Sequence, residues 1–214
     1  MKALIMGDIH GNLIALEQVV KLYINEVDII ISHGDVVNYG PWSNECVELL
    51  DSIGVISLRG NHEQAFINGY YDGKNTLVQE FFNKTYQTFV KHNTIEKYNV
   101  YYENEYFIST HTLNDNYFFP DSSINELVIN KDTIIGHSHY SFIRLTESNH
   151  YIINTGSIGQ NRTNINIIEF CLFDSILNTY EIKQISYDAR IVINQMIHER
   201  YPINCINYYK SKLA

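Results

Sequence analysis

In the first third of the chain, three short apolar stretches each end in a turn that carries a polar side chain. The stretches are residues 2–6, 27–32 and 55–58, and their turns are Gly7-Asp8, Gly34-Asp35 and Gly60-Asn61. The apolar spacing between them predicts two helices, one capped by Asn12 and one that begins at Ser43 or Asn44. Strands that alternate with helices form parallel pairs with right-handed crossovers, so this region predicts a mainly parallel sheet.

The rest of the chain follows a different pattern, in which one long helix precedes many short strands. We expect that helix over residues 76–92, and a last helix that begins near Asp188 and ends before Pro202. Alternating or β-branched residues predict strands over residues 100–102, 106–110, 132–135, 142–145, 151–154, 165–173 and 179–185. The sequence contains no internal repeat and no Pro/Gly/Ser-rich linker. We therefore predict an α/β fold with two sheets, forming one domain over residues 1–214.

Residues of the types that bind metal ions follow five of these predicted strands. They are Asp8, His10, Asp35, Asn61, His111, His137 and His139. The strand ends are expected to meet at one crevice, as in other open α/β sheets. Seven oxygen and nitrogen ligands are too many for one tetrahedral zinc ion and suit two ions that share a carboxylate. Taken singly, each residue is explained as well by a turn aspartate or a core histidine; only their joint placement indicates metal chemistry.

As a set, these motifs resemble the calcineurin-like metallophosphoesterase superfamily. They read Asp8-Ile9-His10-Gly11-Asn12, Gly34-Asp35-Val36-Val37, Gly60-Asn61-His62-Glu63, His111 and Gly136-His137-Ser138-His139. The resemblance covers about residues 1–165. In the segment Asn154-Thr155-Gly156-Ser157, the sequence is similar to the small prokaryotic and phage-type members of the family. It implies a four-layer αββα sandwich, in which two mixed β-sheets are flanked by helices.

The resemblance also implies how the ligands are shared between two divalent ions. Asp8, His10 and His139 would hold one ion, while Asn61, His111 and His137 would hold the other, and Asp35 would bridge them. His62 would lie beside the substrate as a proton donor or charge stabiliser, with Glu63 as a candidate for orienting it. Imidazole, carboxylate and amide ligands without cysteine favour Mn²⁺, with Fe, Zn²⁺, Ni²⁺ or Co²⁺ as alternatives.

The implied function is hydrolysis of phosphate mono- or diesters of a small or nucleotide-like substrate by a metal-activated hydroxide. Arg59 and Arg162 are candidates for binding substrate oxygens, although an ion pair explains Arg59 equally well. The same fold also allows an inactive metal-binding scaffold, a protein Ser/Thr phosphatase or a dinucleoside polyphosphate hydrolase. The sequence disfavours the last two, because Asn38-Tyr39-Gly40-Pro41 stands where such enzymes carry an Arg-Gly pair.

Charge and cysteine content limit the partners of the protein. Fifteen basic and 24 acidic residues give a net charge of −9, so an extended nucleic-acid-binding surface is not expected. A small phosphorylated substrate remains compatible, because bound cations reverse the potential locally. Three separated cysteines and the lack of a signal peptide or apolar span predict a cytoplasmic protein without a membrane anchor. The sequence leaves the oligomeric state open, and residues 174–214 carry no motif that we can assign.

The remaining histidines receive simpler interpretations. His33 is expected in the core or directly behind the ligands, while His92, His150 and His198 are expected at the surface. Trp42 and Tyr39 follow the Asp35 turn, where they either pack that loop or stack on a substrate ring.

Overall fold

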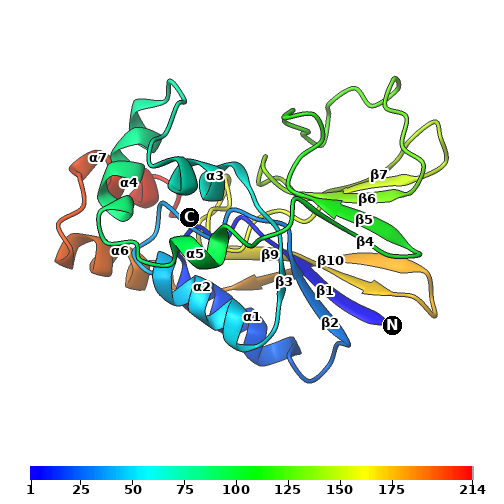
Figure 1. The fold of residues 1–214 in the computed structure, drawn as a ribbon, viewed down its shortest axis with the longest axis horizontal. Helices are drawn as coiled ribbons and strands as arrows, with labels where there is room; N and C mark the ends of the chain where they lie inside the picture. Colours follow the sequence, from blue (N-terminus) through cyan, green and yellow to red (C-terminus); the bar gives the residue numbers. More distant parts are fainter. Residues whose placement is uncertain (214) are drawn as a thin grey trace.

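The computed structural model describes residues 1–213, which form two five-stranded mixed sheets packed face to face (Figure 1). The first sheet has the order β10-β9-β1-β2-β3. Its strands are β1 (Lys2–Met6), β2 (Ile29–Ser32), β3 (Ile56–Ser57), β9 (Ile167–Asp174) and β10 (Thr179–Ser186). The three N-terminal strands are parallel, as predicted, while β9 and β10 extend the sheet in antiparallel pairing.

The second sheet has the order β4-β5-β6-β8-β7. Its strands are β4 (Tyr101–Glu103), β5 (Phe107–Thr110), β6 (Asp132–Ile135), β7 (Phe142–Leu145) and β8 (Tyr151–Asn154). Strands β5, β6 and β8 are parallel, and the two edge strands are antiparallel to their neighbours. Every strand predicted in the second half of the chain is confirmed, and the bounds of β6, β7 and β8 agree with the prediction.

Alternating side chains of β1 build the two cores that hold these layers together. Ala3 and Ile5 point between the sheets, where Ile134 is among the residues of the same cluster. Leu4 and Met6 point the other way, toward helices α1 (Leu13–Tyr23) and α2 (Ser43–Ser52). This period of two along a buried strand makes β1 the central element of the sandwich.

The outer face of the second sheet is covered by the loop between β5 and β6 (Figure 1). Within this loop, Leu127 and Ile129 pack against a cluster that contains Ile135 and Ile152 of the sheet. The predicted sandwich of two mixed sheets with helices is confirmed. The layer over the outer face of the second sheet is an irregular segment, where a helical layer was expected.

The helices differ from the prediction in three places. The expected long helix ends early, as α4 (Thr76–Tyr86), because the chain turns there and α5 (His92–Ile95) forms separately. The sequence interpretation missed α3 (Asn61–Asn68) and α7 (Ile203–Lys210), whereas α1 with its Asn12 cap and α6 (Arg190–His198) are confirmed. Within residues 1–213, no helix is both long enough and apolar enough to cross a membrane.

Candidate metal centre

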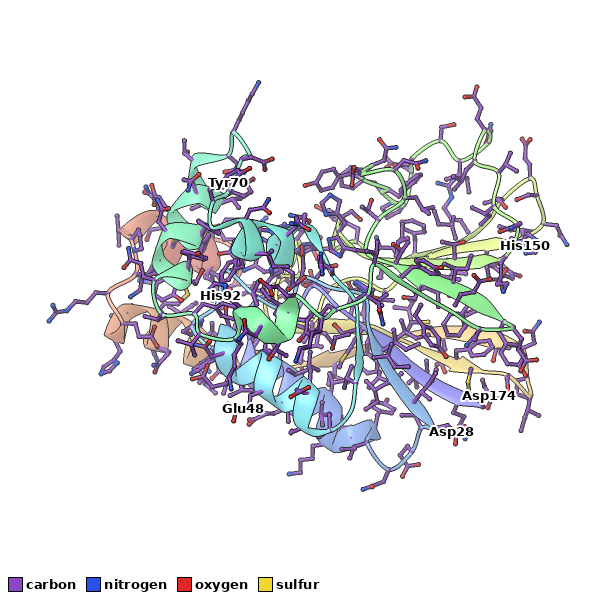
Figure 2. All side chains as sticks on the ribbon, viewed as in Figure 1. Asp28, Glu48, Tyr70, His92, His150 and Asp174 are labelled. Carbon is purple, nitrogen blue, oxygen red and sulfur yellow. The ribbon has the colours of Figure 1, made fainter. Side chains whose placement is uncertain are left out.

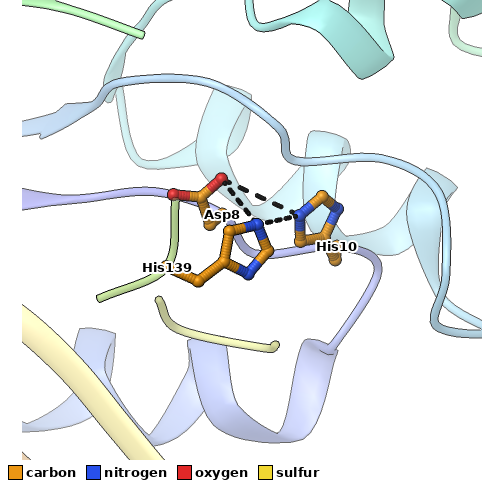
Figure 3. A group of neighbouring side chains, drawn as sticks. All are labelled: Asp8, His10 and His139. Atoms are coloured by element: carbon orange, nitrogen blue, oxygen red, sulfur yellow. Dashed lines mark hydrogen bonds and ion pairs between the residues drawn. The ribbon is translucent and has the colours of Figure 1, made fainter. Parts of the chain in front are cut away.

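The turns after β1 and β6 bring together a first cluster of possible ligands, Asp8, His10 and His139 (Figure 3). All three side chains are buried. The Nε2 atom of His139 lies 3.3 Å from Oδ1 of Asp8 and 3.2 Å from Nε2 of His10. The remaining separation, between Nε2 of His10 and Oδ1 of Asp8, is 3.8 Å. Three donor atoms this close together can share one ion.

A second cluster forms around His111, which follows β5. Its Nε2 atom lies 3.2 Å from Oδ2 of Asp35, 3.1 Å from Oδ1 of Asn61 and 3.2 Å from Nδ1 of His137. Oδ2 of Asp35 is also 3.9 Å from Nε2 of His10 in the first cluster. Asp35 therefore lies between the two clusters, an arrangement typical of a dinuclear site. All seven predicted ligands meet in this one region.

The donor separations and one unpaired atom fit bound metal ions. Ligand atoms about 2.1 Å from one ion lie roughly 3.0–3.4 Å apart, which matches most of the separations above. Oδ1 of Asp8 is buried without a hydrogen-bond partner. A buried carboxylate oxygen is costly to leave unpaired. An ion bound between Asp8, His10 and His139 would provide the missing partner of this oxygen.

Backbone carbonyls orient three of the histidine rings. The Nδ1 atom of each ring contacts a carbonyl oxygen: His10 that of Val37 at 3.2 Å, His111 that of His33 at 3.2 Å, and His139 that of Gln160 at 2.8 Å. A ring that donates from Nδ1 to a carbonyl keeps the lone pair of Nε2 for a metal. His137 is turned differently, because its Nδ1 faces the second cluster.

Several of the seven candidate ligands have a backbone conformation that is uncommon for residues other than glycine. Five of the seven have positive φ angles: Asp8 at 47°, His10 at 50°, Asp35 at 54°, His137 at 70° and His139 at 62°. Each such residue costs on the order of 1–3 kcal/mol, and such conformations concentrate at functional sites. The turns therefore hold these side chains toward the clusters at a cost that packing elsewhere must offset.

Glu63 ties two of the ligand turns together. Its buried carboxylate accepts hydrogen bonds from the backbone N–H groups of Asp35, Val36, Val37 and Gly60, at 2.7–3.1 Å. The same side chain caps α3 and thereby sets the start of the helix that carries Asn61. Glu63 was one candidate for orienting His62, but the hydrogen bonds of its carboxylate found within residues 1–213 all come from backbone N–H groups.

His62 lies beside the clusters, on the side of Asp35. Its Nε2 atom is 3.9 Å from Oδ2 of Asp35, and its backbone N–H donates to Oδ1 of the same residue at 2.9 Å. The ring is held from behind by Asn38, whose Nδ2 atom lies 2.8 Å from Nδ1 of His62. The sequence interpretation noted only the missing arginine at this turn and did not identify Asn38 as the partner of His62.

Burial and mutual charge shift the pKa values of the ligand groups. Burial raises the pKa of Asp8 to about 8, with the charge of Asp35 adding to the effect. Burial also opposes ionisation of Asp35, but His111 and His62 outweigh it and hold the pKa of Asp35 well below its usual range. Burial would lower the pKa of His111, yet the Asp35 carboxylate raises it to about 9. Burial lowers the pKa of His10 and of His139, so both rings are neutral and suited to metal binding.

The two predicted substrate-binding arginines lie in different surroundings. Arg162 has its Nη2 atom 3.4 Å from Nε2 of His139, and its guanidinium lies 5.9 Å from the centre of the Tyr39 ring. Nη1 of Arg162 also donates to the hydroxyl of Tyr208 on α7, the segment to which the sequence assigned no role. Arg59 instead donates to the carbonyl of Glu96 at 2.6 Å, so its guanidinium is bound to the chain near α5.

The other singled-out residues pack the fold. His33 is buried directly behind the ligands, with Nε2 2.7 Å from the hydroxyl of Thr155. His150 lies at the edge of the molecule (Figure 2), and His198 is exposed. The surface position expected for His92 is not found, because its ring is half-buried and packs against Phe89, with ring centres 4.9 Å apart. Tyr39 is buried against His10, with ring centres 4.7 Å apart, so its ring supports the ligand turn.

A family comparison and a curated relative both match most of the chain. The family described as calcineurin-like phosphoesterase matches residues 1–170, a range that contains all seven predicted ligands. An uncharacterized protein of Methanocaldococcus jannaschii is 29% identical over 233 residues, which cover 92% of this chain and 93% of that protein.

Two solved structures show the same fold over nearly the whole chain. A metallophosphoesterase from Sphaerobacter thermophilus has a TM-score of 0.76 at 24% identity and covers 100% of both chains. A hypothetical protein from Pyrococcus horikoshii has a TM-score of 0.80 at 16% identity and covers 97% of both chains. The likeness therefore includes the C-terminal strands and helices beyond the matched family region.

Proposed function

Because this chain belongs to the calcineurin-like phosphoesterase family, we propose that it hydrolyses phosphate mono- or diesters of a small or nucleotide-like substrate. The chain is a metallophosphoesterase with a buried His/Asp metal-binding cluster. One observation carries the proposal: Oδ2 of Asp35 lies between two sets of ligand atoms, 3.2 Å from His111 and 3.9 Å from His10. This is the arrangement that a two-metal hydrolase requires.

Two divalent ions suit the donor set. Asp8, His10 and His139 would hold one ion, Asn61, His111 and His137 would hold the other, and Asp35 would be shared. Mn²⁺ is our first choice for these imidazole, carboxylate and amide ligands, with Fe, Zn²⁺, Ni²⁺ or Co²⁺ as alternatives. When bound, such a pair lowers the pKa of a water molecule and neutralises charge on the phosphate.

Two side chains beside the ligands would act on the substrate. His62 presents Nε2 toward Asp35 and can donate a hydrogen bond to the leaving oxygen. Arg162 lies next to His139 and takes no part in the ion pairs found within residues 1–213. An arginine without a carboxylate partner, next to a metal ligand, is suited to a phosphate oxygen. We leave Arg59 out of this role because its guanidinium donates to the carbonyls of Glu96 and Tyr98, whereas Arg162 contacts His139.

An exposed aromatic ring supports a nucleotide-like substrate. Tyr117, in the loop between β5 and β6, is 56% exposed and stacks on the ligand His137, with ring centres 3.9 Å apart. Phe119 lies nearly parallel to it, with 10° between the ring planes. Aromatic faces of this kind stack on nucleobases without requiring a particular sequence.

Charge and cysteine chemistry support the partners and location that we propose. A net charge of −9 supports a small substrate over an extended nucleic acid, and we propose no membrane partner. Cys46, Cys171 and Cys205 are all free and buried, which supports a cytoplasmic location.

Metal-stripped protein tested on 4-nitrophenyl phosphate and bis(4-nitrophenyl) phosphate examines this proposal directly. We expect turnover only after Mn²⁺, Ni²⁺, Co²⁺ or Zn²⁺ is added back, and the preferred ester separates a monoesterase from a diesterase. Activity that survives thorough chelation would contradict the metal mechanism. No turnover by protein that holds two ions would instead support the inactive scaffold.

The role of His62 has its own test. His62→Ala should lower turnover by roughly 10²–10⁴-fold while the metal content stays unchanged. The matched control is His198→Ala, because His198 is exposed on α6. Loss of a metal ion from the His62 variant would show that His62 is a ligand.

A further inference from the structure

The contact between Asn38 and His62 decides more than the position of a ring. Asn38 is fully buried in the turn after β2 and has a φ of 73°. Its Nδ2 atom lies 2.8 Å from Nδ1 of His62. Either the amide donates to the ring here, or the amide is turned over and its oxygen accepts from a ring N–H.

A neighbouring backbone group settles which way the amide is turned. The N–H of Tyr39 lies 2.8 Å from Oδ1 of Asn38. A backbone N–H can only donate, so the atom that faces it must be the amide oxygen. The amide nitrogen is therefore the atom that faces His62.

This orientation determines where the imidazole carries its proton. An NH₂ group donates, so Nδ1 of His62 must accept, and the ring proton is left on Nε2. That nitrogen is the one 3.9 Å from Oδ2 of Asp35, on the side of the ligand clusters. His62 thus presents a single N–H to the region where the substrate would bind.

We propose that Asn38 is the positioning residue of His62, and that it limits efficient turnover to phosphate esters and anhydrides whose leaving group is a stable oxyanion. This inference rests on the proposed function. As the water-derived oxygen bonds to phosphorus, the bond from phosphorus to the leaving oxygen breaks and its electron pair stays on that oxygen. The Nε2–H of His62 stabilises this charge through a hydrogen bond, and the leaving oxygen takes its proton from water after it departs.

Aryl phosphates of graded leaving-group strength test the proposal in the metal-loaded protein. The leaving group of phenyl phosphate is phenol, which resembles the Tyr side chain and has a pKa of about 10. From the 4-nitrophenyl ester to the phenyl ester, kcat/KM should therefore fall by roughly 10²-fold. Asn38→Asp replaces the amide donor with a carboxylate that accepts from Nδ1–H and stabilises the ring with a proton on both nitrogens. Such a ring can pass its Nε2 proton to the leaving oxygen, so the difference in kcat/KM between the two esters should shrink to less than about tenfold. Metal content should not change.

A matched variant separates this effect from charge and stability. Asn75→Asp makes the same substitution at the exposed N-cap of α4, where aspartate caps equally well, and it should behave as the parent protein. An Asn38→Asp protein with both ions bound and an unchanged leaving-group dependence would overturn the proposal.

Nitrogen NMR of His62 in the Zn²⁺-loaded protein provides a second test that needs no variant of Asn38. The ring signals, assigned by their loss in His62→Asn, should show a proton on Nε2 and none on Nδ1. A proton on Nδ1 would overturn the inference. If the parent protein turns over neither ester, the proposed function fails, and the NMR result still decides the role of Asn38.

Discussion

The ring of His33 is held between two glycines, which makes a double substitution informative. A Cβ atom added at Gly7 would lie 2.2 Å from Cε1 and Nδ1 of His33, and one added at Gly136 would lie 2.1 Å from Cε1. Thr155 holds the same ring through a 2.7 Å hydrogen bond to Nε2. Since Gly7 precedes Asp8 and Gly136 precedes His137, this packing sets the distance between two ligand turns.

The magnitude follows from the overlap. Ordinary contacts begin near 3.4 Å, so in Gly7→Ala the ring would have to move by more than about 1 Å, and Gly136 and Thr155 prevent this. We expect Gly7→Ala to lower the free energy of unfolding by about 2–3 kcal/mol, as overpacked cores do. His33→Ala should cost about 2–4 kcal/mol through the lost hydrogen bond and the cavity. In the double variant the new methyl group occupies space that the ring has left, so the cost should not exceed that of His33→Ala alone.

Urea unfolding of the four proteins measures this cycle. The expected interaction energy is about 2–3 kcal/mol in favour of the double variant, with unchanged m-values. Gly7→Ala alone should lower the Tm by about 4–12 °C, because 1 kcal/mol corresponds to about 2–4 °C for a chain of this size. Additive costs would refute the reasoning, since they would mean that Gly7 and His33 do not share this space.

Three further changes test other parts of the site. Glu63→Gln should lower the free energy of unfolding by about 2–4 kcal/mol, because the amide offers one acceptor oxygen to four backbone N–H groups. Glu48→Gln, at an exposed position, is the control. An equal effect of both substitutions would show that Glu63 does not hold the two turns together. Asp35→Asn should weaken both ions together in metal analysis, and loss of one ion alone would disprove the bridge. Raised pKa values leave Asp8 (about 8) and His111 (about 9) protonated near pH 7 in the metal-free protein. Metal binding should therefore release protons and weaken as the pH falls from 9 to 7, which calorimetry in buffers of different ionisation enthalpy detects; equal heats in both buffers would exclude proton release.

Local pattern was sufficient for the strands. β6, β7 and β8 are short stretches of mainly apolar residues, and their bounds agree with the structure. The missed helix α3 lacks such a signal, since its buried residues include His62 and Glu63. Its start depends on Glu63 bonding to Gly60, and its packing depends on Phe66 meeting Phe89, with ring centres 4.9 Å apart. Contacts of this kind form only when distant segments dock.

The long helix expected over residues 76–92 shows the opposite error. Apolar residues continue past Tyr86, where α4 ends, but Phe89 lies outside the helix and packs on Phe66. Tertiary packing overrides helical periodicity when a side chain gains more contacts outside the helix.

The sequence alone predicts the succession of strands along the chain, the family resemblance and the seven candidate ligands, because strand ends in an α/β fold meet at one edge. Which neighbours hold those residues is decided only in three dimensions. Asn38 reaches His62 over 24 positions, Glu63 reaches Asp35 over 28, and Tyr208 reaches Arg162 over 46. Hydrogen bonds act over about 3 Å. Residues so far apart in the chain therefore become partners only when the turns and helices that carry them dock together.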